Sequence, residues 1–296
     1  KSPNHQITIF KGLLMSTAYA NLLSESEKWE FDLHGYLYLR GVIDPGRLQE
    51  MLEVIIHWLT IDANAVPEPV VRHRQEPYKT HLDHIQYGHR LFQALNADPQ
   101  IIRVVAGLTM GAPRLFHCNF THMVKAQPGD EDHQGFHRDD SGFKFPSGFR
   151  NPHNDYQTAG EEIYCSHVAT WVALADVPEG TGFSLVPGSH KSSFKTPEGL
   201  AVGHHPPISI TVPMQAGDAL IFSTNLLHDA AIWTEDYPRM NIFQRYQLSA
   251  YFNETGKGGL PHEAHKDMIS EEEYELESLS KEEKMAVKRM RMHFGV

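Results

Sequence analysis

The chain of 296 residues has little cysteine, no strong cluster of positive charge and no long apolar run. Its two cysteines, Cys118 and Cys165, are too few for a disulfide framework, which favours buried thiols in a reducing compartment. Lys and Arg total 26 against 37 Asp and Glu, a net charge of −11, and no basic cluster is longer than residues 288–291. Because such a chain repels a phosphate backbone, we expect no nucleic-acid partner. No apolar run approaches the roughly 20 residues that cross a bilayer, so we expect no membrane span.

The composition otherwise fits a globular protein. Hydrophobic residues make up 41% of the chain, enough for a sizeable core. The sequence begins at Lys1 rather than at Met. The few cysteines and the lack of a secretory signal predict a cytoplasmic protein, or a protein of an organelle matrix if a targeting segment was removed.

The order of the segments predicts one α+β domain over residues 1–296. Helical patterns dominate the flanks, residues 26–108 and 270–293. Between them, over about residues 114–252, short β-rich runs alternate with Gly, Pro and Asp turns, as in an antiparallel sandwich or barrel. Within this core, residues 141–162 are long, aromatic and rich in turn residues, and we expect them to form a lid.

Several elements can be placed more closely. Asp44 and Pro45 are typical of a helix start, and the apolar residues that follow at helical spacing predict a buried face: Leu48, Met51, Leu52, Ile55, Ile56 and Leu59. Residues 67–78 contain three prolines and are predicted as a loop. Ser270 with Glu273, and Ser280 with Glu283, form possible capping boxes. Further helices are expected at 91–95 and 101–108, and strands at 35–39, 115–124, 166–174, 184–186, 208–212, 219–223 and 240–252.

Histidine is the residue in excess, with 20 copies, and neutral imidazole is a common metal ligand. In an extended segment, residues two apart point to the same side, so His137 and Asp139 can hold one metal ion together. A distant second histidine would complete a triad of two histidines and one carboxylate, which suits ferrous iron and oxygen chemistry. Spacing alone does not select this pair, because His-x-Asp occurs four times, at 81–83, 137–139, 153–155 and 265–267.

The surrounding sequence selects the copy at 137–139. The motifs downstream of it are Val-Pro-Gly-Ser-His-Lys at 186–191, a Gly-Asp turn at 217–218, His228, and Arg239 eleven residues later. Gly-Tyr-Leu-Tyr-Leu-Arg-Gly-Val-Ile-Asp-Pro opens the region at 35–45. Over about residues 31–252 the sequence with these motifs resembles the phytanoyl-CoA dioxygenase-like family of Fe(II)- and 2-oxoglutarate-dependent oxygenases.

The resemblance implies a fold and a set of site residues. The fold would be a double-stranded β-helix, a jelly-roll barrel like that of the cupins. The Fe(II) ligands would be His137, Asp139 and His228, and 2-oxoglutarate and O2 would be cosubstrates. Arg239 would pair with the far carboxylate of 2-oxoglutarate, a role that suits the bidentate guanidinium.

Two further cosubstrate contacts follow from the same resemblance. Trp171 matches a tryptophan that the family often places beside 2-oxoglutarate. His81 falls near a position where some members have a lysine against the cosubstrate, although Lys79 competes for this role. Ala230 departs from the pattern, because the family often has Ser or Thr two residues after the distal histidine. Other hydroxyls, or fewer bonds, would then hold the cosubstrate.

The resemblance implies oxidation of an unactivated C–H bond with release of succinate and CO2. Asp139 argues against a halogenase, which leaves that position without a carboxylate. We expect hydroxylation, or desaturation or ring closure in a natural-product pathway. The expected substrate is a small, polar or carboxylate-bearing metabolite, since Lys144, Arg150 and His153 lie close to the metal motif and could meet an anionic group.

Two other classes remain open: a non-catalytic protein that kept the fold, and a metal-dependent enzyme on the same barrel that needs no cosubstrate. Other polar residues have more ordinary readings. His117 and His122 are expected as core or strand histidines, His190 as a structural residue, and Arg245 as a rival of Arg239 or a substrate contact. The helices of residues 270–293 could pack on their own barrel or on a second subunit, so a monomer and a homodimer are both compatible with the sequence.

Overall fold

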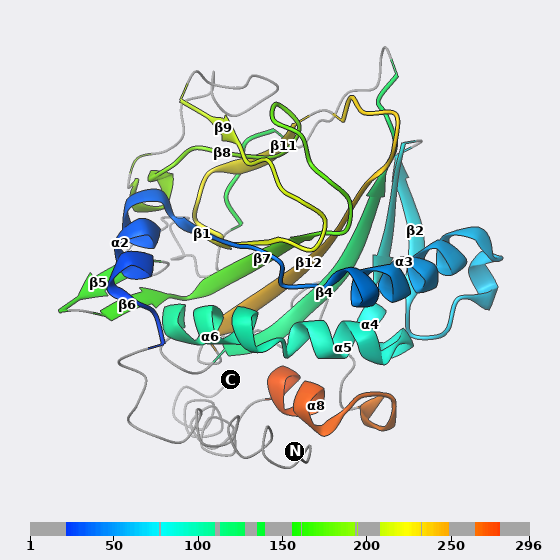
Figure 1. Ribbon diagram of the computed structural model, residues 1–296. Helices are drawn as coiled ribbons and strands as arrows, with labels where there is room; N and C mark the ends of the chain where they lie inside the picture. Colours follow the sequence, from blue (N-terminus) through cyan, green and yellow to red (C-terminus); the bar gives the residue numbers. More distant parts are fainter. Residues whose placement is uncertain are drawn as a thin grey trace, which may run out of the picture.

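The computed structural model describes residues 22–76, 78–109, 113–127, 135–139, 156–160, 162–192, 194, 208–231, 233–248 and 264–278. Helices and strands follow one another along the chain as α2 (Glu25–His34), β1 (Tyr36–Leu39), α3 (Pro45–Thr60), β2 (Val71–Glu76), β3 (Lys79–Asp83), α4 (Ile85–Gly88), α5 (Arg90–Asn96), α6 (Pro99–Leu108), β4 (Pro113–Met123), β5 (Tyr156–Ala159), β6 (Glu162–Cys165), β7 (His167–Ala173), β8 (Gly182–Leu185), β9 (Ile210–Thr211), β10 (Ala219–Ser223), β11 (His228–Ala231), β12 (Arg239–Leu248) and α8 (Glu271–Glu277) (Figure 1).

The strands form two facing antiparallel sheets. The larger sheet has seven strands in the order β1-β10-β7-β12-β4-β3-β2, and the smaller has three in the order β11-β8-β9. Helices α4, α5 and α6 run along the face of the large sheet that is turned away from the small one (Figure 1). This is the predicted α+β class with a double-stranded β-helix. The strands β5 and β6 form a separate hairpin.

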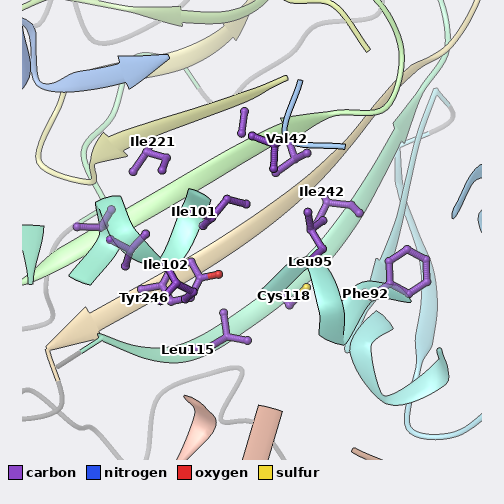
Figure 2. Close-up of a cluster of buried hydrophobic side chains, with 14 of the residues drawn as sticks. Val42, Phe92, Leu95, Ile101, Ile102, Leu115, Cys118, Ile221, Ile242 and Tyr246 are labelled. Atoms are coloured by element: carbon purple, nitrogen blue, oxygen red, sulfur yellow. The ribbon is translucent and has the colours of Figure 1, made fainter. Parts of the chain in front are cut away.

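Alternation along the strands gives the large sheet two different faces. In β7, Val168 and Val172 pack toward the helices, together with Ile221, Ile242 and Tyr246 from neighbouring strands (Figure 2). The intervening residues Ala169, Trp171 and Ala173 belong to a second core between the two sheets. The helices therefore cover one face, and the other face is left to build a cavity inside the barrel.

The helix predicted from Asp44 and Pro45 is α3. The Asp44 side chain accepts hydrogen bonds from the backbone N–H groups of Gly46 and Arg47 at 3.0 and 3.1 Å, and Pro45 occupies the first turn. Met51 and Ile55 are buried as predicted, and Leu48, Leu52 and Leu59 pack against the core. The prediction was wrong for Ile56, which is 51% exposed, because Trp58 turns inward on the buried face instead.

The predicted loop at residues 67–78 was also wrong. Its prolines flank a strand rather than interrupt it, and β2 occupies Val71–Glu76 at the edge of the large sheet, paired with β3. An edge strand tolerates flanking prolines because only one of its sides is hydrogen-bonded. The region 26–108 thus supplies three strands of the large sheet, β1, β2 and β3, besides its helices.

The helix predicted after Ser270 is α8, and the Ser270 side chain caps it by accepting from the N–H of Glu273 at 3.1 Å. This helix packs on its own barrel, below α5 in Figure 1. Asn96 donates to Glu273 at 2.7 Å, and Gln86 donates to Glu277 at 3.0 Å. Among the described residues, no helix has the length and apolar character that crossing a membrane requires.

The Gly-Asp turn at residues 217–218 leads into β10. Gly217 has φ +96°, and a Cβ there would lie 2.5 Å from the backbone oxygen of Ile43, so both conformation and space require glycine. Asp218 is buried and accepts hydrogen bonds from the N–H groups of Gly41 and Gln215 at 2.8 and 2.9 Å, and from the hydroxyl of Tyr38. This Gly-Asp motif therefore fixes the start of β10 rather than contributing chemistry.

Candidate active site

Three side chains predicted as metal ligands lie together. One ligand atom from each of His137, Asp139 and His228 lies within 4.8 Å of the other two, and among the described residues no other group of three or more His, Cys, Asp or Glu is so arranged. His137 and His228 form an isolated antiparallel bridge, with reciprocal N–H···O bonds of 2.9 Å between their backbones. The N–H of Asp139 donates to the oxygen of Thr224 at 3.0 Å. Backbone pairing therefore brings the residue at 228 beside the pair at 137 and 139.

Both imidazoles are oriented in the same way. The Nδ1 atom of His137 lies 2.8 Å from the oxygen of Gly135, and Nδ1 of His228 lies 2.7 Å from the oxygen of Leu226. A carbonyl oxygen only accepts, so each Nδ1 carries a proton, and in the neutral form of the ring Nε2 is then the atom with the free lone pair. A backbone acceptor behind the ring is the usual partner of a metal-binding histidine. The Nε2 atom of His137 lies 3.8 Å from Oδ1 of Asp139.

The charge states of His228 and Asp139 suit a cation. Burial, and then the neighbouring His137, lower the pKa of His228 to about 4, so this imidazole is neutral at pH 7. Burial works to raise the pKa of Asp139, but Arg245 and the two histidines outweigh it and lower the pKa below its ordinary value. The site therefore offers two imidazole nitrogens and one carboxylate, the donor set that open ferrous sites use.

The block at residues 186–191 supports this arrangement from behind. Ser189 accepts a hydrogen bond from the N–H of Leu227 at 2.7 Å, and Asn225 donates to the oxygen of His190 at 2.6 Å. Arg138 points away from the triad and donates to the oxygens of Asn225 and Ser189 at 3.0 and 3.2 Å. These bonds tie the segments before His228 and around His137 to one turn. The block therefore holds in position the two segments that carry the triad.

A cavity of about 300 Å³ opens beside the triad between the two sheets. Besides His137 and His228, its lining contains the predicted cosubstrate contacts His81, Trp171 and Arg239, and the rivals Lys79 and Arg245. The inner faces of β3, β4, β7 and β12 supply most of the wall. Its other lining residues are His73, Asp83, His117, Asn119, Thr121, Phe183, Asp229, Ala230, Asn241, Phe243 and Arg245.

One end of the cavity carries the predicted cosubstrate contacts. Arg239 is 4% exposed, and its guanidinium lies 5.9 Å from the centre of the Trp171 ring. Lys79 and Arg239 lie at the same level of the sheet, because both pair with Met123 of β4. The spacing that predicted Arg239 from His228 therefore corresponds to a cation inside the cavity beside the triad.

His81 is the next residue after Lys79 on the same face of β3, and it is buried. Burial, and then Lys79 and His73, lower the pKa of His81 to about 4, so the ring is neutral. Its Nδ1 lies 3.3 Å from the Asn119 amide nitrogen and 3.2 Å from the Thr121 hydroxyl. Because an amide NH2 only donates, Nδ1 accepts and Nε2 carries the proton. This Nε2 is buried and has no hydrogen-bond partner in the protein, so His81 offers a donor to whatever fills the cavity.

A second polar group lies beside the triad. The sequence had indicated only Arg245 in it as a site residue, as a rival of Arg239 or a substrate contact. Nε of Arg245 lies 3.4 Å from Oδ2 of Asp139, and its Nη1 lies 2.7 Å from Nδ1 of His117. Nε2 of His117 lies 3.6 Å from Oδ1 of Asp83, and Oδ2 of Asp83 lies 3.6 Å from Nδ1 of His73. His117, expected as a core or strand histidine, is a strand residue of β4, and it also lines the cavity.

A signal for these residues was present in the sequence. In β4, His117, Asn119 and Thr121 are polar at alternate positions, whereas Cys118 and Phe120 between them are buried in the helix-side core. Polar residues on one face of an otherwise buried strand predict a cavity. The His-x-Asp copy at 81–83 also lines the cavity, whereas that at 265–267 lies in a 3-10 turn and that at 153–155 lies outside the described residues.

Lys144, Arg150 and His153, predicted to contact substrate, also lie outside the described residues, as does most of the predicted lid at 141–162. Ala230 lines the cavity, so that position supplies no hydroxyl. Thr121 is a hydroxyl residue elsewhere in the lining, and its oxygen contacts His81.

The fold and the site together define an oxygenase that depends on Fe(II) and 2-oxoglutarate. The family model for phytanoyl-CoA dioxygenase matches residues 31–241, which is more than half of the chain. The chain therefore belongs to the phytanoyl-CoA dioxygenase family. No curated protein sequence matches this chain.

Solved structures agree on the fold. HygX from Streptomyces hygroscopicus, solved with nickel and 2-oxoglutarate bound, is 19% identical, with a TM-score of 0.62 over 80% of this chain and 96% of that one. SnoN, a non-haem α-ketoglutarate-dependent epimerase from nogalamycin biosynthesis, is 24% identical, with a TM-score of 0.54 over 76% of this chain and 83% of that one. EctD from S. alaskensis, with bound Fe, is 16% identical, with a TM-score of 0.57 over 78% of each chain.

Proposed function

We propose that His137, Asp139 and His228 bind the Fe(II) of this oxygenase. The observation that carries the proposal is the orientation of the two imidazoles. Each is held through Nδ1 by a backbone carbonyl, and each presents Nε2 beside the Asp139 carboxylate, with the ligand atoms within 4.8 Å. Three protein ligands leave the other positions on the metal for cosubstrate and O2.

We infer that 2-oxoglutarate lies between the triad and Arg239. Arg239 would hold the far carboxylate by charge-assisted hydrogen bonds, with the indole of Trp171 against it. The Nε2–H of His81 would donate to the same cosubstrate, which satisfies a buried donor that no protein atom meets. His81 thereby supplies a bond that Ala230 cannot.

The bound cofactor and cosubstrate supply the chemistry: with O2 they oxidise a C–H bond of the substrate and release succinate and CO2. The protein holds, orients and shields these reactants. Phe183 and Phe222 pack against the His228 ring at centroid distances of 5.6 and 5.0 Å, so aromatic rings shield this proposed ligand. Exclusion of water protects a reactive site from side reactions.

The substrate we propose is a small, polar metabolite, including carboxylate-bearing compounds. The cavity wall favours it, because it combines histidines, amides and ionised side chains with few aliphatic ones. Hydroxylation is the default outcome, and ring closure or desaturation in a natural-product pathway is the variant. A HygX structure contains hygromycin B, and SnoK of nogalamycin biosynthesis is a carbocyclase. Lys144, Arg150 and His153 remain candidates for contact with a substrate carboxylate.

The test is an anaerobic titration of the metal-free protein with Fe(II) and 2-oxoglutarate, followed by visible absorption. We expect a metal-to-ligand charge-transfer band that is lost in Asp139→Ala and His228→Ala. Asp267→Ala is the matched control, because it removes an exposed aspartate from another His-x-Asp copy. Metal binding without the band would favour a cosubstrate-free metalloenzyme. Absence of metal binding would favour a non-catalytic protein.

A further inference from the structure

The cavity has a second polar end that the proposed cosubstrate does not use. Asp83 of β3 and Asn119 of β4 are direct cross-strand partners on the inner face of the large sheet. The next residue along β4 on that face, His117, faces Arg245. Asp83 lies four residues along β3 from Lys79, which is at the level of Arg239. Since alternate strand residues advance by about 6.6 Å, this group is separate from the Arg239 end.

Both members of the pair present acceptors. Asn119 is 8% exposed, and its amide nitrogen donates a hydrogen bond to His81. The Oδ1 atom of Asn119 is buried and has no hydrogen-bond partner in the protein. The Asp83 carboxylate has His117 and His73 at 3.6 Å each, longer than ordinary hydrogen bonds. Burial works to raise the pKa of Asp83, but His117, His73 and His84 outweigh it and lower the pKa. Asp83 is therefore a carboxylate at pH 7.

Its histidine neighbour does not neutralise it. Burial lowers the pKa of His117, and Nδ1 of that ring accepts from the Arg245 guanidinium. His117 is thus a neutral ring that turns its Nε2–H toward Asp83. The positive charge of Arg245 lies beside Asp139. The negative charge of Asp83 therefore faces the cavity, with the His117 and His73 rings no closer than 3.6 Å.

We propose that Asp83 and Asn119 form a substrate subsite that binds a protonated primary amine. An ammonium group has three donors and one positive charge, which match a carboxylate and an unpaired amide oxygen. This inference rests on the proposed function, because it places the amine of the substrate beside the proposed metal site. It refines the substrate class to a polar metabolite that carries an amine, and it is compatible with a carboxylate elsewhere on the same molecule.

The competing interpretation gives Asp83 a purely internal role, as a support for His117 and through it for Arg245. The two interpretations differ in what Asp83→Asn changes. Loss of an amine subsite weakens amine binding and leaves the cosubstrate band intact. Loss of a support for Arg245 weakens the band itself and affects every ligand alike.

The experiment uses calorimetric titration of the full chain, loaded anaerobically with Fe(II) and 2-oxoglutarate. The probes are putrescine, L-lysine and glucosamine, each beside the derivative in which every amine is N-acetylated, with glucose as a probe for hydroxyl groups alone. We expect at least one amine to bind, its N-acetyl derivative and glucose to bind at least tenfold more weakly, and Asp83→Asn to weaken the amine by roughly 10- to 100-fold. Asp83→Glu should restore part of the affinity, and Asp267→Asn, an exposed control, should change nothing.

Three results would overturn the amine subsite: no amine binds to the loaded protein, N-acetyl derivatives or glucose bind as well as the amines, or Asp83→Asn binds amines as wild type does. The charge-transfer band is recorded in the same samples. Its absence rejects the proposed cosubstrate, whereas its presence with any of the three results rejects only the subsite. If no band forms, titrating the same amines into the metal-free protein still tests the amine subsite.

Discussion

Replacement of Ser189 by alanine tests whether the turn at residues 186–191 supports the metal side of the site. The Ser189 hydroxyl is buried and accepts from the N–H of Leu227 at 2.7 Å, immediately before His228. Ser189→Ala removes the acceptor and leaves a buried N–H without a partner. The cost of such an orphaned donor is about 1–3 kcal/mol, well above that of an ordinary surface change. We expect the free energy of unfolding to fall by that amount.

The assay is urea unfolding of the metal-free protein. The slope of the free energy of unfolding against urea concentration should be the same in the variant and in wild type. Ser192→Ala is the matched control, because Ser192 is three residues away in the same segment and exposed, and we expect it to change stability by less than about 0.5 kcal/mol. Adding Fe(II) should stabilise Ser189→Ala less than wild type, since stabilisation by a ligand follows its affinity. Equal stability of the two alanine variants would refute the reasoning.

Three further outcomes are expected. Arg239→Gln should raise the KM for 2-oxoglutarate by roughly 10- to 100-fold in a succinate-release assay, because a charged partner of the carboxylate is lost, and an unchanged KM would exclude Arg239 from that role. Ile242→Ala should lower the free energy of unfolding by about 2–5 kcal/mol in urea, because Ile242 is completely buried in the helix-side core. Burial, and then Glu277, raise the pKa of Glu273 well above its ordinary value of 4.5, so its stabilising contribution is present below that pH and is lost as the pH rises toward the raised pKa. The free energy of unfolding should therefore decline above about pH 5, and Glu273→Gln should flatten that decline in urea titrations at several pH values.

The strands and helices with strong local signals followed from the sequence. Asp44 and Pro45 began a helix because a side-chain acceptor and a fixed φ act within one turn of chain. The strands β7, β10 and β12 were placed by short β-rich runs that alternate with turn residues. The edge strand β2 was missed because its stability comes from pairing with β3 rather than from its own residues.

The residues of the candidate site also fall into two groups: those that local sequence indicated and those that only the folded chain brings together. His137 and Asp139 share a side because residues two apart in an extended segment do so, and this is a local property. Motif spacing then joined them to His228 and Arg239. Nothing local indicates that Arg245 would reach Asp139, because 106 residues separate them and only the pairing of strands brings them together.

The sequence by itself determined the class of protein, the α+β architecture and the residues of the proposed metal and cosubstrate contacts, because those depend on short spacings and on motifs. The tertiary structure decided which remaining polar residues share the cavity. His117, which local reasoning treated as a strand or core residue, faces that cavity with Asp83 and Asn119, since the register of β3 on β4 sets their level and alternation sets their face. Register is a property of two distant segments, and neither segment specifies it alone.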